Sequence, residues 1–175
     1  MIVFRNTDAD VPFFWGSDRQ PPARWHAAGE GPAQYTSSTP DACWAEFLRH
    51  AGITDPEDLA GVERTIWAID IPDDEPAVVP MLSARTLTGG ASSYRRCQKE
   101  AARLRAGGAT RLVAPSAAAL PGGPSGWVSD PDLEPADPRD EQTIVLFGPR
   151  PELVGWMAAT RGRPLPSLLR RVRHL

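Results

Sequence analysis

Three side chains in the first third of the sequence carry functional groups that suit work on a nucleotide. Arg24, Tyr35 and Glu46 follow one another at equal spacing. A guanidinium group can bind a phosphate through parallel hydrogen bonds, an aromatic ring can stack on a flat base, and a carboxylate can orient a sugar hydroxyl. Together these groups would permit chemistry at a sugar that is joined to a base and a phosphate.

Each of these residues also has a purely structural interpretation. A glutamate in a helix is most often a solvated surface residue. Glu46, however, lies in the apolar run CWAEFL, where a carboxylate is either paired or functional. Arg24 precedes Trp25, and such a pair often packs through the arginine stem. Tyr35 ends a predicted strand at the mouth of a loop, which is a common place for a ligand-binding ring.

The residues around Glu46 predict a short strand followed by a capped helix. The strand would carry Tyr35 and the helix Glu46, which places the two side chains on consecutive elements. Serine and threonine are preferred N-cap residues, proline is favoured at the first helical position, and glycine often ends a helix. The signals are the strand 33–36, an N-cap at Ser38 or Thr39, Pro40, the helix 41–50 and Gly52.

The remaining predicted elements mix strands and helices without regular alternation. This pattern indicates the α+β class, and the length suits a single domain over residues 1–175. The elements are strands at 1–4, 64–72, 110–114 and 143–147, a helix at 92–106, loops at 11–25 and 121–142, and a C-terminal segment, LLRRVRHL, that is either an edge strand or a short helix.

Composition limits the classes of protein to consider. No window is long and apolar enough to span a bilayer, and acidic residues follow the N-terminus too soon for a signal peptide, so we expect a cytoplasmic protein. Cys43 and Cys97 cannot form a disulfide framework, and the histidines show no metal-ligand spacing, so we expect no metal. A cysteine enzyme is a poor alternative, because neither thiol is predicted at a helix N-terminus beside a base.

The charges are unevenly distributed along the chain. The net charge is −3, yet residues 161–175 hold five arginines and no acidic residue. The acidic remainder argues against general nucleic-acid binding. The run RGRP at 161–164 resembles an AT-hook core, which would suit a non-catalytic DNA-binding or interaction protein. A basic turn before a final strand is the favoured interpretation of this run.

Several motifs together resemble the RES domain family, which is named for its Arg, Glu and Ser. Family members have a Gly-Gly-Arg-Trp-Asn run, a tyrosine strand, a helix with an Ala-Leu-x-Glu core and an arginine–apolar–Pro–Ser motif. The matching residues here are Arg24, Trp25, Gly29, Tyr35, Ala45 and Glu46, with Ser116 in TRLVAPSA and Arg5 in IVFRNTD. Pro22-Ala23 and His26 stand where the family has Gly-Gly and Asn, and the match extends from about Ile2 to Pro149.

The resemblance implies a fold similar to the ADP-ribosyltransferase core and an enzyme that cleaves its substrate NAD⁺ at the nicotinamide–ribose bond. Glu46 would stabilise an oxocarbenium-like ribose near the 2′-hydroxyl, and nicotinamide would leave neutral, without a general acid. Arg24 and Tyr35 are also expected in the catalytic set, with Arg24 on the pyrophosphate and Tyr35 on the nicotinamide ring. Ser116 and Arg5 would help to bind NAD⁺, Ser116 through a phosphate or a ribose.

The same resemblance implies a toxin that is neutralised by a helix-turn-helix antitoxin of the Xre type. Family members resemble NAD⁺ glycohydrolases or phosphorylases, and a few resemble enzymes that transfer ADP-ribose to a protein, so a mono-ADP-ribosyltransferase is the alternative function. The acceptor of the ADP-ribosyl group stays open, as does the oligomeric state, with a homodimer one option. The intact set of Arg24, Tyr35, Glu46 and Ser116 argues against a catalytically inactive scaffold.

Overall fold

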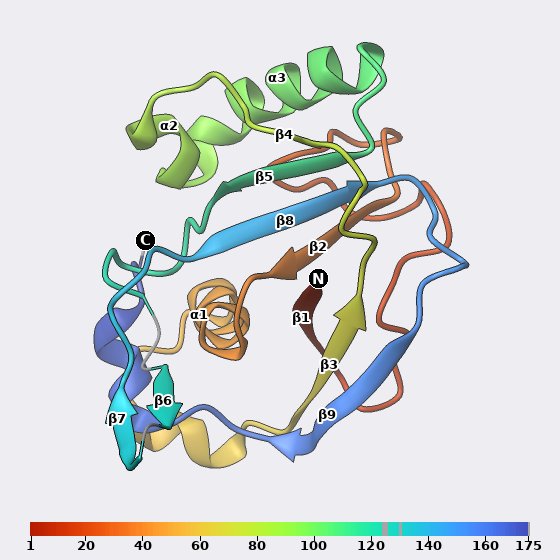
Figure 1. Ribbon diagram of the computed structural model, residues 1–175. Helices are drawn as coiled ribbons and strands as arrows, with labels where there is room; N and C mark the ends of the chain where they lie inside the picture. Colours follow the sequence, from red (N-terminus) through yellow and green to blue (C-terminus); the bar gives the residue numbers. More distant parts are fainter. Residues whose placement is uncertain (124–125, 130, 175) are drawn as a thin grey trace.

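A seven-stranded mixed sheet organises the computed structural model of the chain, which describes residues 1–123, 126–129 and 131–174 (Figure 1). The strand order is β4-β5-β8-β2-β1-β3-β9, and neighbours are antiparallel except for β4 and β5. With helices packed on this sheet, the fold is a single α+β domain, as predicted. The strands are β1 (Ile2–Thr7), β2 (Ala33–Ser37), β3 (Arg64–Asp70), β4 (Ala77–Val78), β5 (Arg111–Pro115), β8 (Gln142–Phe147) and β9 (Gly155–Gly162).

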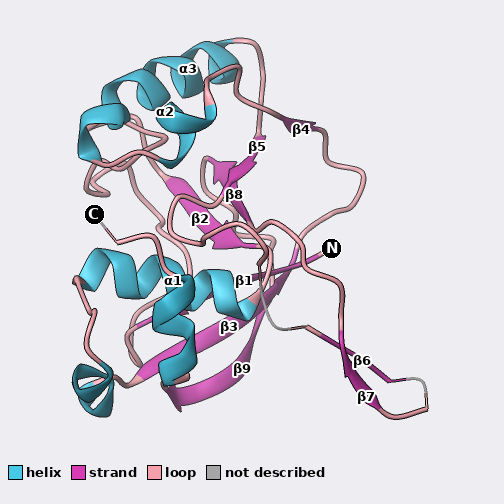
Figure 2. Ribbon diagram, turned by 90° about the vertical axis from the view of Figure 1, so that its left-hand side faces the viewer, coloured by secondary structure: helices cyan, strands magenta, loops and turns pink. Residues whose placement is uncertain are grey.

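The sheet opens between β1 and β2. These strands share the single registered pair Phe4–Ser37, whereas β1 pairs with β3 from Ile2 to Thr7. Figure 2 shows β5, β8 and β2 as one half of the sheet and β1, β3 and β9 as the other. The helix α1 (Pro40–Ala51) contacts both β1 and β2. Side chains at the opening can therefore line a cavity rather than a continuous ladder.

The helix α1 has the caps that the sequence predicts. Thr39 is the N-cap and accepts a hydrogen bond from a backbone N–H of the first turn, Pro40 is the first helical residue, and Gly52 ends the helix at a φ of 67°. The buried carboxylate of Glu141 accepts hydrogen bonds from the hydroxyls of Ser38 and Thr39. These contacts attach the start of α1 to the segment before β8.

Two helices cover the half of the sheet that contains β5. They are α2 (Ala84–Thr88) and α3 (Tyr94–Ala106), which lie beside β5 at the top of Figure 1. Gln98 on α3 donates to the backbone carbonyls of Ala23 and His26, which ties the helix to the segment that carries Arg24. Short 3₁₀ helices complete the fold: η1 (Pro56–Gly61), η2 (Ala91–Ser93) and η3 (Pro166–Arg171). In the described ranges, every helix is too short or too polar to cross a bilayer.

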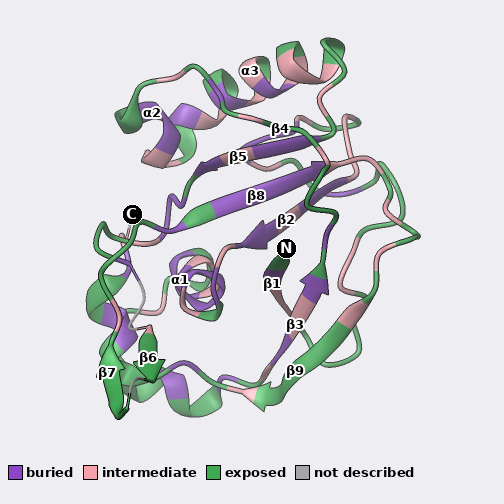
Figure 3. Cartoon of the chain, viewed as in Figure 1, coloured by how far each residue is buried: buried purple, intermediate pink, exposed green. Residues whose placement is uncertain are grey.

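Two sequence predictions for the second half of the chain need correction. Residues 121–142 were expected to be a loop, but they hold the hairpin β6 (Trp127–Ser129) and β7 (Leu133–Pro135). The RGRP run begins at the end of β9, a strand that the sequence did not predict, rather than in a turn before a final strand. Both elements are exposed (Figure 3), so their side chains lack the alternation that marks a half-buried strand.

The C-terminal segment LLRRVRHL begins within a short helix and does not form an edge strand; the helix was one of the two predicted alternatives. It contributes to the 3₁₀ helix η3, whose Leu168 and Leu169 are buried beside α1. The final residue, Leu175, lies outside the described residues. The basic C-terminal segment is thus partly anchored to the core of the domain.

Candidate functional site

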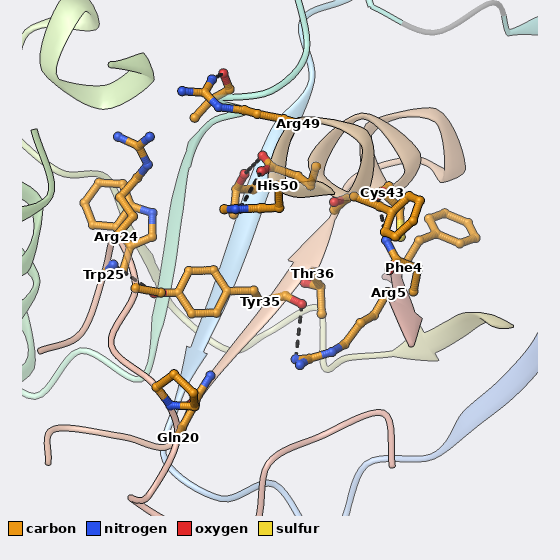
Figure 4. A pocket seen from close by; sticks show the side chains of 18 of the residues that line it. Phe4, Arg5, Gln20, Arg24, Trp25, Tyr35, Thr36, Cys43, Arg49 and His50 are labelled. Atoms are coloured by element: carbon orange, nitrogen blue, oxygen red, sulfur yellow. Dashed lines mark hydrogen bonds and ion pairs between the residues drawn. The ribbon is translucent and has the colours of Figure 1, made fainter. Parts of the chain in front are cut away.

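A cavity of about 480 Å³ lies where the sheet opens, bordered by β1, β2, α1 and the segment before β2 (Figure 4). Its volume is in the range of small-molecule sites. Arg5, Arg24, Tyr35 and Glu46 all line it, although they come from separate parts of the chain. Ser116 contacts Glu46 from behind the cavity wall. The structure thus brings the five predicted residues into one region.

The Glu46 carboxylate is held on one of its two oxygens. Oε1 accepts hydrogen bonds from Ser116 Oγ at 3.0 Å and from Thr143 Oγ1 at 3.3 Å. Oε2 lies 3.8 Å from Nε2 of His50, one turn further along α1. The side chain is 24% exposed, so the carboxylate is accessible from the cavity while its orientation is fixed.

Ser116 acts as a positioning residue for Glu46 in this structure. Its Oγ accepts hydrogen bonds from the backbone N–H groups of Ala118 at 3.2 Å and Ala119 at 3.1 Å, and its proton goes to Glu46. The hydroxyl is buried in the turn that follows β5. This contact differs from the phosphate or ribose contact that the sequence suggested.

The Tyr35 hydroxyl holds the loop that carries Arg24. It accepts the backbone N–H of Trp25 at 2.8 Å and lies 3.0 Å from Nδ1 of His26. Nε2 of His26 lies 3.0 Å from the Pro21 carbonyl, which can only accept, so Nε2 carries the proton and Tyr35 donates to Nδ1. Burial lowers the pKa of His26, which favours this neutral form, and raises the pKa of Tyr35.

Two arginine side chains converge on one carbonyl oxygen at the α3 side of the cavity. The Gly89 carbonyl accepts from both Arg24 and Arg49. The Arg24 guanidinium also lies 4.8 Å from the centroid of the Tyr94 ring. In the described part of the chain, neither arginine is paired with a carboxylate. Other acceptors are the Thr86 carbonyl (3.3 Å) and Ser93 Oγ (3.0 Å) for Arg24, and the Ala117 carbonyl for Arg49.

Arg5 reaches the cavity from β1 and has few partners. Its Nη1 donates to the Tyr35 carbonyl at 3.4 Å (Figure 4). Its guanidinium carbon lies 5.9 Å from the centroid of the Phe14 ring. It forms no ion pair with a carboxylate among the described residues. Burial lowers the pKa of Arg5 to about 10, so the group stays charged at neutral pH. A half-buried cation of this kind suits an anionic ligand.

The comparison with known proteins settles the family. The family model of the RES domain matches residues 4–154, which is most of the chain. The chain belongs to the RES domain family. Among curated protein sequences no match is found.

The fold of this RES domain is similar to a solved structure. The match is a chain in the crystal structure of the M. tuberculosis MbcT–MbcA toxin–antitoxin complex, with a TM-score of 0.57 and 16% sequence identity. The alignment covers 97% of this chain and 86% of that chain. At this identity the likeness concerns the fold.

The cavity of the RES domain is also lined by residues that the sequence did not predict for the site, among them Arg49, His50, Trp15 and Tyr94. Arg49 and His50 lie one turn beyond Glu46, so their helical spacing could have revealed them. Trp15 and Tyr94 gave no comparable signal, because they reach the cavity from a loop and from the start of α3. Their contribution depends on how distant segments pack.

The cysteines of the RES domain are buried and reduced. Asn6 donates to the backbone carbonyl of Cys43, and burial raises the pKa of the Cys43 thiol to about 12. A thiolate nucleophile is therefore disfavoured there. Over the described ranges, the His, Cys, Asp and Glu side chains form no group of three that could hold a metal ion.

Proposed function

We propose that this RES domain cleaves NAD⁺ at the nicotinamide–ribose bond. The observation that supports it best is the Glu46 carboxylate, which two hydroxyls hold through Oε1. It lies at a cavity lined by Arg5, Arg24 and Arg49, which form no ion pair with a carboxylate among the described residues. The bond breaks with its electron pair going to nicotinamide, which leaves neutral. The ribose then carries developing positive charge that a fixed carboxylate beside its 2′-hydroxyl would stabilise.

The arginines would bind the pyrophosphate of NAD⁺. Arg24 was the residue expected to do so, but three of its five N–H donors already go to protein oxygens. Arg5 has one such hydrogen bond and faces the same cavity. We therefore assign the larger share of pyrophosphate binding to Arg5, with the remaining donors of Arg24 in support. The Tyr35 ring would contact the nicotinamide.

The variant Glu46→Gln tests the proposal. Glutamine keeps the volume and can still accept hydrogen bonds from Ser116 and Thr143, but it carries no charge. We expect the rate of nicotinamide release to fall about 10²- to 10³-fold with the thermal unfolding midpoint unchanged. Glu57→Gln, on the exposed side of η1, is the matched control and should keep full activity. Full activity of Glu46→Gln would remove this carboxylate from the site.

The acceptor of the ADP-ribosyl group distinguishes the proposed activities. Water would give ADP-ribose, phosphate would give ADP-ribose 1″-phosphate, and a protein acceptor would gain the mass of ADP-ribose, as expected of a mono-ADP-ribosyltransferase. Mass spectrometry of products formed with and without phosphate, in the presence of EDTA, separates these outcomes. We expect turnover to survive EDTA, because a neutral leaving group needs no Lewis acid.

We further propose that the protein is a cytoplasmic toxin with an Xre-type helix-turn-helix antitoxin. The supporting finding is that its structural neighbour comes from a toxin–antitoxin complex. Expression of the RES domain alone should arrest growth, Glu46→Gln should be harmless, and co-expression of the adjacent reading frame should rescue growth. A harmless wild-type protein with measurable NAD⁺ cleavage in the same cells would exclude the toxin role.

The basic C-terminal segment offers fewer free charges to an antitoxin than the sequence suggests. Arg171 donates to the Gly123 carbonyl, and Arg173 donates to the Ala117 carbonyl at 2.9 Å. Arg161, Arg163 and Arg170 are exposed, but Nε of Arg161 lies 3.9 Å from Oε2 of Glu63. An acidic antitoxin surface would therefore meet Arg163 and Arg170 first, and such an association would weaken with salt.

A further inference from the structure

A loop tryptophan at the cavity is held in place by a buried glutamine. Gln34 on β2 is fully buried, and its side chain binds both backbone groups of Trp15. Oε1 accepts the Trp15 N–H at 2.9 Å, and Nε2 donates to the Trp15 carbonyl at 2.7 Å. The same Nε2 also donates to the Gly148 carbonyl at 3.3 Å. The backbone of Trp15 is thus fixed by an internal group whose own hydrogen-bonding needs are met.

The indole of Trp15 is nevertheless exposed. It lines the cavity, and 41% of the residue is accessible to solvent. The nearby Gln20 reinforces the arrangement, because its side chain exchanges two hydrogen bonds of 2.8 Å with the backbone of Ala33 at the start of β2. A large apolar ring is therefore presented to the cavity by a rigid support. Such an arrangement suits a flat ligand group that covers the ring.

Trp15 and Glu46 reach the cavity from opposite faces of the sheet. Side chains alternate along a strand, so Gln34, which holds Trp15, and Tyr35 point to opposite sides of β2. Arg5, on β1 at the opening, contacts the strand that carries Tyr35 and also the loop that carries Trp15. It donates to the Tyr35 carbonyl, and its guanidinium lies over Phe14, the neighbour of Trp15. A carboxylate, a cation and an exposed indole therefore follow one another through the opening between β1 and β2.

We propose that Trp15 is the stacking platform for the second base of the dinucleotide, the adenine of NAD⁺. This inference rests on the proposed function, in which Glu46 meets the nicotinamide ribose and Arg5 the pyrophosphate. The order of these groups along NAD⁺ matches the order of the residues along the opening. Only a dinucleotide has a second base to stack on Trp15, so the platform gives the site a preference for a dinucleotide over a mononucleotide. Stacking on an indole does not read the hydrogen-bonding edges of that base.

Calorimetric binding of ADP-ribose and of ribose 5-phosphate tests the platform directly. ADP-ribose carries adenine and the pyrophosphate but lacks the scissile bond, whereas ribose 5-phosphate lacks the base. Trp15→Ala should weaken ADP-ribose binding about 5- to 150-fold, the range for loss of one stacked base. Trp15→Phe should stay close to wild type, because a phenyl ring also stacks. Trp156→Ala, which removes a comparably exposed indole from the edge strand β9, is the matched control.

A kinetic measurement adds a second readout. Trp15→Ala should lower the ratio of kcat/KM for NAD⁺ to that for nicotinamide mononucleotide by a similar factor, because only NAD⁺ has an adenine. Equal affinity of wild type and Trp15→Ala for ADP-ribose would overturn the inference. So would wild-type binding of ADP-ribose that is no tighter than that of ribose 5-phosphate.

The two proposals fail in different ways. Trp15-dependent binding of ADP-ribose without any nicotinamide release would leave the platform in place and reject the proposed activity. If the wild type releases nicotinamide and Trp15→Ala binds ADP-ribose as tightly as the wild type, the platform is rejected and the proposed activity is kept. The variant is expected to fold, because the contacts to Gln34 involve only the backbone of residue 15.

Discussion

Replacement of Tyr35 by phenylalanine separates the role of its ring from that of its hydroxyl. The ring would stay in the cavity wall, but the hydroxyl bonds to Trp25 N–H (2.8 Å) and His26 Nδ1 (3.0 Å) would be lost. Each buried polar group left without a partner costs about 1–3 kcal/mol. For these two groups we therefore expect the free energy of unfolding to fall by about 2–6 kcal/mol. A domain near the middle of the usual range of about 5–15 kcal/mol would still fold.

Urea unfolding followed by tryptophan fluorescence measures this loss, with the free energy obtained by linear extrapolation. Tyr94→Phe is the matched control, because the Tyr94 hydroxyl makes no hydrogen bond within the described residues and its ring also lines the cavity. Its effect should stay within about 0.5 kcal/mol. A Tyr35→Phe variant as stable as this control would refute the argument and leave the Tyr35 hydroxyl available for a ligand.

Two further variants test contacts that support the site. Because burial lowers the folded-state pKa of His26, the unfolded chain binds a proton first as the pH falls through 6.5, so stability should drop there by up to about 1.4 kcal/mol per pH unit. His26→Asn should flatten this dependence in unfolding curves between pH 7.5 and 5.5, whereas an unchanged slope would contradict the assignment. Arg173→Ala removes donors to the carbonyls of Ser116 and Ala117 and should reduce stability by about 1–3 kcal/mol and lower kcat through Glu46. Arg170→Ala, an exposed neighbour, should do neither, and equal effects of the two would contradict the proposed anchoring.

The local elements around the site could be predicted from the sequence alone. The strand with Tyr35 and the capped helix with Glu46 appear where neighbouring residues indicate them, and Thr39 takes one of the two expected N-cap positions. Caps, turns and helical spacing involve residues close together in the chain, so their physical signals are local. The motifs in the sequence also gave the resemblance to the RES domain family, and the family match confirms that resemblance.

The partners of these residues were decided by the tertiary structure. Ser116 could be recognised as a motif residue, but its hydrogen bond to Glu46 depends on β5 lying beside β8 and on α1 packing against β2, the other neighbour of β8. Arg24 likewise donates hydrogen bonds to the carbonyls of Thr86 and Gly89, which precede α3 in the chain. No local sequence pattern reveals these contacts. The exposed strand β9 and the clamp of Gln34 on Trp15 were not predicted at all. Strand order and loop closure bring together residues that are distant in sequence. The free energy that favours these contacts comes from packing of the whole chain rather than from interactions between neighbouring residues.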